Sequence, residues 1–331
     1  MKVCHFIASR GLGRGEFYID LANELCRHIE VSLLVPKGAR YLHRVSPEIE
    51  IHEYRANNSR RNPLLLFELY RYLKKNPPDL VHTHFSKATE IFLPLNRGLQ
   101  LPHVATKHNP RKGRVYERTP HVIAVSNIVR SSIQNGAPEV IHNGITPLPM
   151  AARNKRPATF TIVAVGRLDP IKGFDQLLRD LAPLDLDFRL KIIGDGSQRE
   201  MLSRLIDELK LGDKVELCGF REDIPEQLAN ADLVLISSQS EGGPVIALET
   251  LFYGNMLLST PVGIIPEILP ADFQITPGGF GCAVESVANN YNKYHSRFQE
   301  IQTSYRDEFL LSNIAQQHID YYKKIRNYSA R

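Results

Sequence analysis

The sequence predicts an α/β protein with two domains, each built around a buried parallel sheet. Three observations support this fold class. The chain has 331 residues, about twice the length of a typical domain. Short β-branched runs alternate with amphipathic stretches, as in proteins whose helices connect parallel strands. This alternation begins near residue 2 and begins again near residue 160, so we expect two Rossmann-like domains facing a cleft.

The first half contains apolar runs typical of buried strands and longer stretches typical of helices. We expect strands over residues 2–8, 30–36, 79–85, 103–108 and 121–126, and helices over 17–29 and 64–75. The second helix, LLLFELYRYLKK, carries Leu, Phe and Tyr on more than one face. It therefore has two interpretations, a helix packed on the sheet or a helix docked on a bilayer.

The second half repeats the pattern after a stretch that contains several prolines. Composition and rhythm both break within residues 143–158, which marks a domain boundary. Further strands are expected over 160–166, 188–194, 214–219 and 231–238. Near the end, Ile314, Ile319, Tyr322 and Ile325 predict a helix with one packing face. We therefore expect an N-terminal domain over 1–150, a second domain over 151–307, and a terminal helix over 308–331 that packs back on the first domain.

The charge is divided unevenly between the two halves. The net charge of the chain is +5. Residues 1–150 hold 21 Lys and Arg against 12 Asp and Glu, a net +9, and the remainder holds 20 against 24, a net −4. The basic half indicates an anionic partner, such as a phosphorylated substrate, a nucleic acid or a lipid surface. A solvated basic face is the simpler alternative.

Composition limits the class of protein. Hydrophobic residues make up 43% and charged residues 23%, which is typical of a folded soluble chain. The four cysteines, at positions 4, 26, 218 and 282, show no metal-binding spacing and no disulfide framework, which fits a reducing compartment. The first residues are too polar for a signal peptide or a membrane span, so we expect a cytoplasmic protein.

The segment SEGGPVIALE places two acids eight positions apart around a turn. An apolar strand precedes it, and Pro244 suits the first position of a following helix. Gly242 and Gly243 allow close approach of the backbone to a ligand, and the free N–H groups at the start of a helix favour phosphate. Glu249 then lies about 7–8 Å along the helix axis, the span from a diphosphate to its ribose. Glu249 could thus hold the ribose diol while Glu241 reaches sugar hydroxyls.

This Glu-x7-Glu arrangement resembles the signature of retaining GT-B glycosyltransferases, which use nucleotide-activated sugars. The segment VGRLDPIKG resembles the strand-end motif in which an arginine and a lysine bind the donor diphosphate, here Arg167 and Lys172. Two cations at the end of a strand can neutralise a leaving diphosphate. IIGDGSQREML and VELCGF resemble the next two strands of the family, whose loops close over the base. The resemblance is strongest over residues 160–270.

The resemblance implies a set of site residues. Catalytic roles fall to Arg167, Lys172, Glu241 and His108. Donor binding falls to Glu249, Gly15, Gly166, Gly194, Gly219, Phe220, Gly242, Gly243, Pro244 and Val245. Acceptor binding falls to Arg14, Lys107, Arg111 and Lys112. No metal ligand is expected, and the donor is a UDP- or GDP-sugar with no other cofactor.

The N-terminal half resembles the family in several short elements. GRGE, residues 13–16, resembles a glycine pair before the first helix, and His108 in ATKHNP occupies the position of a histidine that contacts the donor sugar. A dinucleotide-binding reading of GLGRG fails because Gly-x-Gly-x-x-Gly needs glycine at position 16, which is Glu16. No recognised nucleic-acid-binding motif supports the basic half as a nucleic-acid reader.

Two clusters have a second interpretation. His82 and His84 share one face of a strand, as a metal pair would, but no third ligand is spaced to complete a site, so we expect strand-end histidines near substrate or solvent. The basic stretch KHNPRKGRVYER follows a strand end. It is expected to contact the acceptor or a membrane, with a solvated surface as the alternative.

The function that follows is transfer of a sugar from a nucleotide-sugar to an anionic glycan or glycolipid, such as lipopolysaccharide core or another envelope glycan. The resemblance implies that the anomeric configuration is retained and that no metal is needed. We also expect a peripheral contact with the anionic inner face of the cytoplasmic membrane, and no nucleic-acid partner. A GT-B-fold nucleotide-sugar epimerase and a non-catalytic sugar-nucleotide-binding protein are the alternatives.

Overall fold

The structure, a computed structural model, describes residues 1–11, 16–57, 59–149 and 159–329. The chain forms two compact units. Unit 1 combines Met1–Gly144 with Leu311–Arg331, and unit 2 is Ile145–Leu310. The boundaries between the units lie a few residues from the predicted domain boundaries. Along the chain, unit 2 is inserted between the two parts of unit 1. In the part of the chain that is described, no helix is long and apolar enough to cross a membrane.

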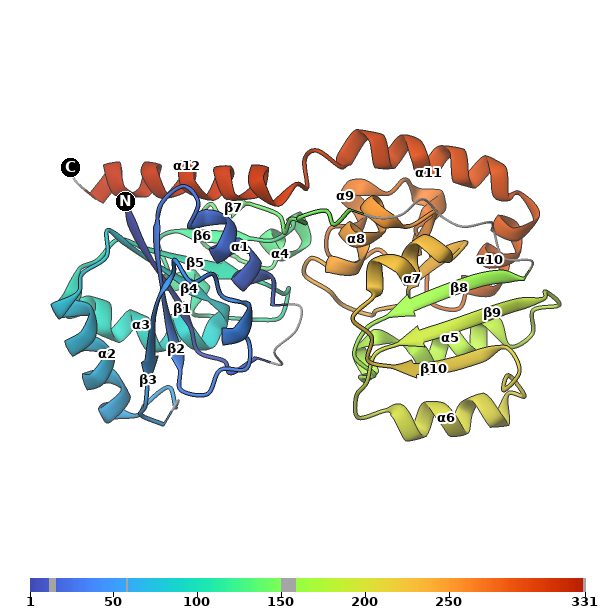
Figure 1. The fold of residues 1–331 in the computed structure, drawn as a ribbon, viewed down its shortest axis with the longest axis horizontal. Helices are drawn as coiled ribbons and strands as arrows, with labels where there is room; N and C mark the ends of the chain where they lie inside the picture. Colours follow the sequence, from blue (N-terminus) through green and yellow to red (C-terminus); the bar gives the residue numbers. More distant parts are fainter. Residues whose placement is uncertain (12–15, 58, 150–158, 330–331) are drawn as a thin grey trace. The chain divides into compact units, whose positions relative to one another are not determined.

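Unit 1 contains a seven-stranded parallel sheet in the order β3-β2-β1-β4-β5-β6-β7 (Figure 1). Its strands are β1 (Lys2–Ile7), β2 (Glu30–Pro36), β3 (Glu50–Tyr54), β4 (Leu80–His84), β5 (His103–Lys107), β6 (Val122–Ala124) and β7 (Glu139–Val140). The five predicted strands are confirmed. Strand β3 is not predicted from the sequence, because EIHEY has no apolar run, and neither is the two-residue β7.

The helices of unit 1 are α1 (Phe17–Leu25), α2 (Pro63–Lys75), α3 (Phe85–Leu99), α4 (Asn127–Ser131) and α12 (Leu311–Ser329). Helix α12 packs beside α1 on one face of the sheet (Figure 1). Its predicted packing face is confirmed, because Ile314, Ile319, Tyr322 and Ile325 are all buried. Burial of each such side chain contributes about 1.5–3 kcal/mol to folding.

Helix α2 packs on the sheet, which is the first of its two interpretations. Asn62 caps its start by accepting a hydrogen bond from the Leu64 backbone N–H, and Pro63 occupies the first turn. Three leucines, Leu65, Leu69 and Leu73, are buried against the sheet. On another face, Leu64 is 71% exposed and Phe67 65% exposed. The helix therefore packs on the sheet and still presents an apolar pair to the surface.

Unit 2 contains a five-stranded parallel sheet in the order β10-β9-β8-β11-β12. Its strands are β8 (Phe160–Val165), β9 (Phe188–Ile193), β10 (Val215–Gly219), β11 (Leu233–Ile236) and β12 (Leu257–Ser259). Its helices are α5 (Phe174–Leu181), α6 (Arg199–Glu208), α7 (Ile224–Asn230), α8 (Val245–Tyr253), α9 (Ile265–Ile268), α10 (Phe280–Asn289) and α11 (Tyr291–Tyr305). The four predicted strands are confirmed, and the short β12 is an addition.

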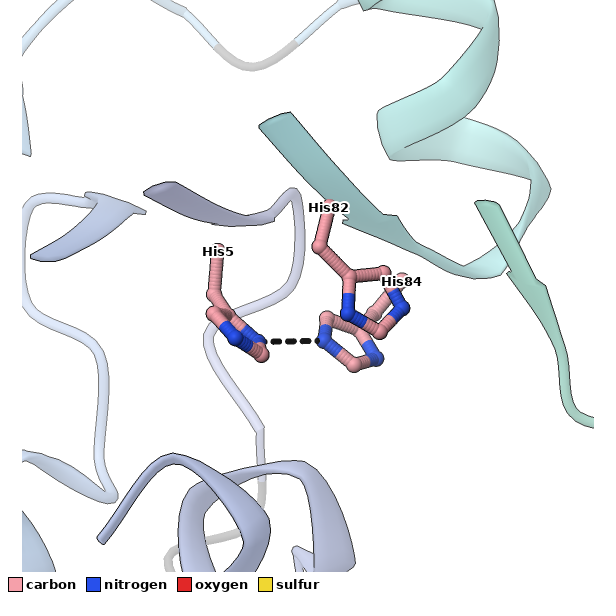
Figure 2. A group of neighbouring side chains, drawn as sticks. All are labelled: His5, His82 and His84. Atoms are coloured by element: carbon pink, nitrogen blue, oxygen red, sulfur yellow. Dashed lines mark hydrogen bonds between the residues drawn. The ribbon is translucent and has the colours of Figure 1, made fainter. Parts of the chain in front are cut away.

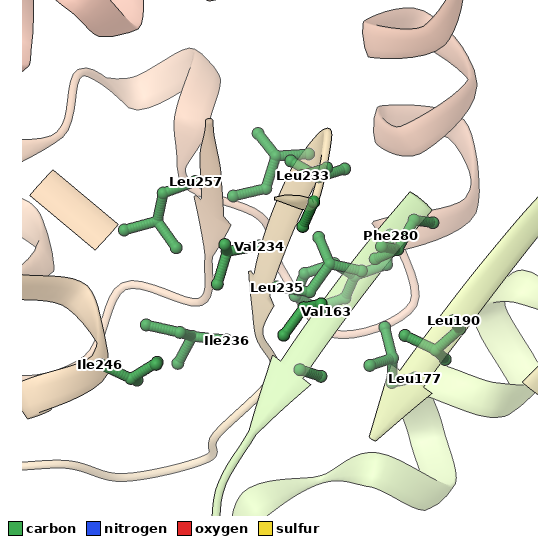
Figure 3. Close-up of a cluster of buried hydrophobic side chains, with 14 of the residues drawn as sticks. Val163, Leu177, Leu190, Leu233, Val234, Leu235, Ile236, Ile246, Leu257 and Phe280 are labelled. Atoms are coloured by element: carbon green, nitrogen blue, oxygen red, sulfur yellow. The ribbon is translucent and has the colours of Figure 1, made fainter. Parts of the chain in front are cut away.

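The core of unit 2 lies between its sheet and the covering helices. Figure 3 shows Val163 and Leu190 from the sheet beside Leu177 of α5 and Phe280 of α10, and Ile246 of α8 on the side of β11. All of these side chains are buried. Both units are thus α/β layers around a parallel sheet. In each sheet the strand order reverses beside the first strand, at β1/β4 in unit 1 and at β8/β11 in unit 2. Ligands of open parallel sheets bind beyond the carboxyl ends of the strands at such reversals.

Candidate functional site

A group of polar side chains lies at the reversal point of unit 2. The segment that follows β8 supplies Arg167 and Lys172, and the segment that follows β11 supplies Ser237, Ser238 and Glu241. Because β8 and β11 are hydrogen-bonded neighbours running in parallel, both segments leave the same edge of the sheet. The sheet topology therefore brings together residues about 70 positions apart in the sequence.

Lys172 and Glu241 form an ion pair in this group. The distance from Lys172 Nζ to Glu241 Oε1 is 2.5 Å, and both side chains are about one-fifth exposed. Ser238 Oγ donates a second hydrogen bond to the same oxygen at 2.8 Å. Ser237 Oγ donates to the Lys172 carbonyl at 2.9 Å. The two serines were not among the predicted site residues, although their position at the end of an apolar strand could have indicated them.

Arg167 lies in the same loop as Lys172, but its side chain is more exposed than that of Lys172. Its Nη2 lies 2.7 Å from Asp169 Oδ2, and the arginine side chain is 61% exposed. Asp169 also precedes the 3-10 turn Pro170–Lys172. Its carbonyl accepts the Lys172 N–H at 3.0 Å. The Asp169 carboxylate therefore orients the Arg167 side chain, and the Asp169 carbonyl closes the turn that carries Lys172.

Glycines allow the strand ends to approach closely. A Cβ on Gly194 would lie 1.9 Å from the Gly166 carbonyl oxygen, and Gly194 has a φ of +139°. A Cβ on Gly166 would meet the Lys172 side chain at 3.2 Å. Gly263, in the turn after β12, has a φ of +56° and would place a Cβ 2.7 Å from the Gly242 carbonyl oxygen. At Gly194 and Gly263, only glycine combines the positive φ with this close approach, so these two residues let the Gly166 and Gly242 segments keep their places.

The helix predicted after the Gly-Gly turn is α8. It starts one residue later than expected, because Pro244 is the extended residue before the helix, with a ψ of 113°, and Val245 is its first residue. Glu249 is half-buried on the fifth position. One turn further on, burial raises the pKa of Tyr253, and the nearby Glu249 carboxylate adds to that rise. The predicted spacing between the helix start and Glu249 is therefore present.

The end of β10 supplies the remaining donor-binding candidates. Gly219 has a φ of +69° beside a register shift in the β10–β9 pairing, and its carbonyl accepts the Gly194 N–H at 2.8 Å. Phe220 follows and is 48% exposed. An exposed aromatic ring at a strand carboxyl end is well suited to contact a planar base.

The predicted site residues of unit 1 differ in their exposure to solvent. Arg14 and Gly15 lie outside the described residues. Arg111 and Lys112 are exposed after β5. Lys107, predicted to bind acceptor, is only 2% exposed, and its ammonium donates to the Ser132 carbonyl at 3.2 Å and to Ser132 Oγ at 2.7 Å. The Lys107 ammonium therefore holds this turn, and the acceptor contact of Lys107 stays a prediction.

Histidines gather at the reversal point of unit 1. His5 of β1 joins His82 and His84 of β4, and ligand atoms of the three lie within 4.8 Å of one another (Figure 2). The expectation that no third histidine is placed to join the pair is therefore wrong. The sequence separation of His5 hid it, although β1 and β4 are neighbours and His5 is in register with His82. His108 lies next to the group, with its Nε2 3.3 Å from His84 Nδ1.

Two family models match the chain. Residues 150–293 match the model described as Glycosyl transferases group 1, and residues 13–147 match Glycosyltransferase Family 4. These two ranges correspond closely to the main part of unit 2 and to most of unit 1.

Individual relatives agree with the family models. A lipopolysaccharide core biosynthesis glycosyltransferase of Rhizobium meliloti is 23% identical over 78% of this chain and 79% of its own length. An uncharacterised glycosyltransferase of Methanocaldococcus jannaschii is 25% identical over 58% of either chain, less than two thirds of that relative. The crystal structure of Anabaena HepE with UDP and glucose has a TM-score of 0.81 at 18% identity, covering 98% of this chain and 100% of that chain. Because the two family models together span most of the sequence and the fold is shared, the chain belongs to the glycosyltransferases with the GT-B fold.

Proposed function

We propose that the chain transfers a sugar from a nucleotide-sugar donor to an anionic glycan or glycolipid of the cell envelope, such as lipopolysaccharide core. The observation that carries this proposal is the Lys172–Glu241 pair at the β8/β11 reversal. It combines a cation for phosphate with a carboxylate for sugar hydroxyls at the point where such sheets bind ligands. The Rhizobium relative, a lipopolysaccharide core enzyme by name, supports an envelope acceptor.

The donor would be held along α8 and the loop after β8. Arg167, Lys172 and the Gly242–Gly243 backbone before α8 supply positive potential for a diphosphate. The Lys172 ammonium has three N–H groups, so it can keep Glu241 and still donate to phosphate oxygens. Glu249, further along α8, would accept from the ribose diol. A UDP- or GDP-sugar is the proposed donor, and the UDP bound in HepE favours UDP.

The proposed chemistry retains the anomeric configuration and needs no metal ion. The bond from the anomeric carbon to the departing phosphate breaks while a bond to the acceptor oxygen forms on the same face of the sugar. The departing phosphate oxygen takes the acceptor's proton. The work of the protein is then orientation and stabilisation of the leaving diphosphate, which Arg167 and Lys172 supply as fixed cations. Activity should persist in excess EDTA, and product NMR should show the donor's anomeric configuration.

Thermal-shift measurements with UDP, GDP, ADP and CMP, each with and without Mg²⁺, test the donor site. We expect a rise in the unfolding temperature with UDP or GDP that does not need Mg²⁺. The absence of a shift with all four nucleotides would contradict the donor site. Incubation with the matching nucleotide-sugar alone separates transfer from epimerisation, because conversion of the donor to an epimer without acceptor would overturn the transferase assignment.

We also propose that unit 1 binds the anionic inner face of the cytoplasmic membrane. Exposed Arg111 and Lys112 supply charge, and α2 places Leu64 and Phe67 at helical spacing from the exposed Arg71 on its surface. Such a mixed apolar and basic helix face is typical of interfacial binding. We expect binding to phosphatidylglycerol-containing vesicles that weakens with salt and with the double change R111Q/K112Q.

The matched control for this vesicle experiment is Arg204→Gln, an exposed charge on α6 of unit 2. It should leave vesicle binding unchanged. Binding that is independent of salt, or that is equally strong on purely zwitterionic vesicles, would contradict the membrane proposal.

A further inference from the structure

Three imidazole rings form a hydrogen-bonded row in unit 1. His5 Nδ1 lies 2.9 Å from His84 Nε2, the contact drawn in Figure 2. His84 Nδ1 in turn lies 3.3 Å from His108 Nε2. His5 and His84 are at most 1% exposed, whereas His108 is half-buried. The row thus runs from the interior of the sheet to a ring that reaches the surface after β5.

Burial favours the neutral form of the three rings in this row. Burial lowers the pKa of His5 and of His108 to about 3 and lowers the pKa of His84 well below its usual value, and the neighbouring histidines add to the effect. A neutral imidazole has one N–H and one bare nitrogen. Each contact in the row therefore needs one donor and one acceptor, and only two proton arrangements satisfy both contacts at once.

The inner end of the row distinguishes the two arrangements. His5 Nε2 is buried and has no hydrogen-bond partner among the described residues. In one arrangement this nitrogen carries an orphaned N–H, and in the other it is a bare nitrogen. Buried N–H groups without a partner are rarer in proteins than unpaired acceptors. The favoured arrangement has His5 Nδ1 donating to His84 Nε2 and His84 Nδ1 donating to His108 Nε2.

This arrangement determines the tautomer of His108 at the outer end of the row. Since His108 Nε2 accepts, the single proton of the neutral His108 ring sits on Nδ1. The Phe85 ring packs against His108 with 4.3 Å between ring centroids, and Phe85 holds a φ of +66°. A left-handed backbone is strained at a large aromatic residue, and such strain is found most often at functional sites. This residue, directly after His84, covers one side of the His108 ring.

We propose that His5 and His84 are positioning residues that hold His108 in the Nδ1–H tautomer, so that His108 donates a hydrogen bond to an oxygen atom of the bound substrate. That oxygen belongs to a sugar hydroxyl or to a phosphate. The substrate contact rests on the proposed function, whereas the tautomer of His108 does not. Neither His5 nor His84 needs to touch the substrate.

A metal site at His5, His82 and His84 is the competing interpretation. Five of the six ring nitrogens already have partners, because His82 Nδ1 lies 2.7 Å from Tyr322 Oη and His82 Nε2 lies 2.6 Å from Thr106 Oγ1. Only His5 Nε2 is open. A metal ion would have to displace several of these hydrogen bonds and bring its charge into a buried site without a carboxylate, so the geometry favours the row of hydrogen bonds.

The tautomer is measured by long-range ¹H–¹⁵N NMR of protein labelled with ¹⁵N-histidine, with His108→Gln identifying the His108 signals. We expect wild-type His108 to be protonated on Nδ1, a result that requires no altered residue in the row. His5→Leu should produce a mixture of both tautomers, and His5→Asn, whose amide can replace the Nδ1–H donor, should restore the wild-type spectrum. Protonation of wild-type His108 on Nε2, or no change in His5→Leu, would overturn the proposal.

The substrate contact is measured in the same spectra. The nucleoside diphosphate selected by thermal shift is added alone and as its glucose conjugate. A change at His108 Nδ1 with the diphosphate alone identifies a phosphate oxygen, and a change only with the conjugate identifies a sugar hydroxyl. No change with either would overturn the contact. In turnover, His5→Leu should lower kcat about tenfold with little change in the donor KM, and His5→Asn should recover most of it.

Metal addition completes the test. Co²⁺ or Zn²⁺ should leave the His108 signals in place, and Co²⁺ should give no ligand-field absorption bands that depend on His5. Stoichiometric Co²⁺ bands that His5→Leu abolishes would overturn the tautomer row in favour of a metal centre. Failure of nucleotide binding would count against the proposed function alone, because the tautomer measurement uses the protein without substrate.

Discussion

His82 Nδ1 lies 2.7 Å from Tyr322 Oη, although 240 positions separate the two residues in the chain. Both side chains are fully buried, and the second ring nitrogen of His82 lies 2.6 Å from Thr106 Oγ1. Helix α12 is therefore tied to the middle of the unit 1 sheet by a buried polar contact as well as by apolar packing. A buried hydrogen bond of this kind matters mainly because its loss leaves an unpaired polar atom.

Removal of the Tyr322 hydroxyl should destabilise the protein. In Tyr322→Phe, His82 Nδ1 loses its partner in a buried site, and we expect a loss of about 1–3 kcal/mol in the free energy of unfolding. Urea denaturation measures it. Tyr321→Phe is the matched control on the same helix, because no hydrogen bond of its hydroxyl to a described residue is found, and it should cost less than about 0.5 kcal/mol. Equal effects of the two changes would contradict the tie.

The Lys172–Glu241 pair should be required for turnover. Lys172→Met removes a cation next to the leaving diphosphate, and Glu241→Gln removes the charge of its partner. We expect each to lower kcat/KM by about 10²-fold or more, because both lose charge-assisted contacts in a partly buried site. Steady-state kinetics with the donor provide the measurement, with the exposed Arg204→Gln as a charge control. Wild-type kinetics in either variant would exclude this pair from the site.

A side chain at Gly194 should disrupt unit 2. Gly194→Ala would place a Cβ 1.9 Å from the Gly166 carbonyl oxygen, at a φ of +139° that side chains rarely adopt. We expect a loss of more than about 3 kcal/mol in the free energy of unfolding, seen as poor soluble yield or a much lower melting temperature. Gly212→Ala is the control, since a Cβ there meets nothing within 4 Å. A Gly194→Ala protein as stable as the control would contradict the close approach of Gly194 to the Gly166 carbonyl.

Substitutions of Lys107 and Lys112 should have different effects, the first on stability and the second on vesicle binding. Burial lowers the pKa of Lys107, whose ammonium nevertheless keeps two hydrogen bonds to Ser132. Lys107→Met should therefore lower the free energy of unfolding by about 1–3 kcal/mol with vesicle binding unchanged. Lys112→Met should weaken vesicle binding and leave stability unchanged, because Lys112 is exposed. Vesicle binding that depends on Lys107 but not on Lys112 would reverse this assignment.

His103 should make the protein sensitive to acid. Burial lowers its pKa from 6.5 to about 3, so the folded state keeps the ring neutral where the unfolded state binds a proton. The stability it contributes is fully present above pH 6.5 and is lost as the pH falls from 6.5 towards 3, by about 1.4 kcal/mol per pH unit. In His103→Gln, the decrease in unfolding free energy between pH 7 and pH 5 should shrink by about 2 kcal/mol.

The exposed His43 provides the control for this measurement, because His43→Gln changes a ring on the surface. It should leave the pH dependence of unfolding nearly unchanged. Equal pH profiles of wild type and His103→Gln, compared by urea denaturation at the two pH values, would show that His103 does not contribute to the acid sensitivity.

The sequence was sufficient to predict the layered fold, because apolar strands buried on both faces leave continuous runs such as FTIVAV and SLLV. It also predicted the order of the elements around Arg167, Lys172 and Glu241. Strand β3 escaped because it lies at the edge of the sheet with polar residues. Edge strands carry a weaker apolar signal than central ones.

The contacts within the sites were harder to predict from the sequence, because they depend on which strands become neighbours. His5 and His84 are 79 positions apart, and only the pairing of β1 with β4 brings them into contact. The burial of Lys107 depends on the turn that places Ser132 beneath it, and a lysine after a strand gives no sign of that turn. The orientation of Arg167 by Asp169 could have been anticipated from their spacing in one tight loop.

Unit 1 is formed by two separate stretches of the chain, and this affects the order in which the two units can fold. The face of its sheet that includes Val3, Ile7 and Val104 is covered in part by α12, which follows all of unit 2 in the chain. During synthesis, the N-terminal sheet emerges first but keeps this apolar face without α12 until residues 145–310 have been made. Synthesis of unit 1 therefore begins before that of unit 2 and is completed after it, and a chaperone that shields apolar surface would act on unit 1 while unit 2 is already folding.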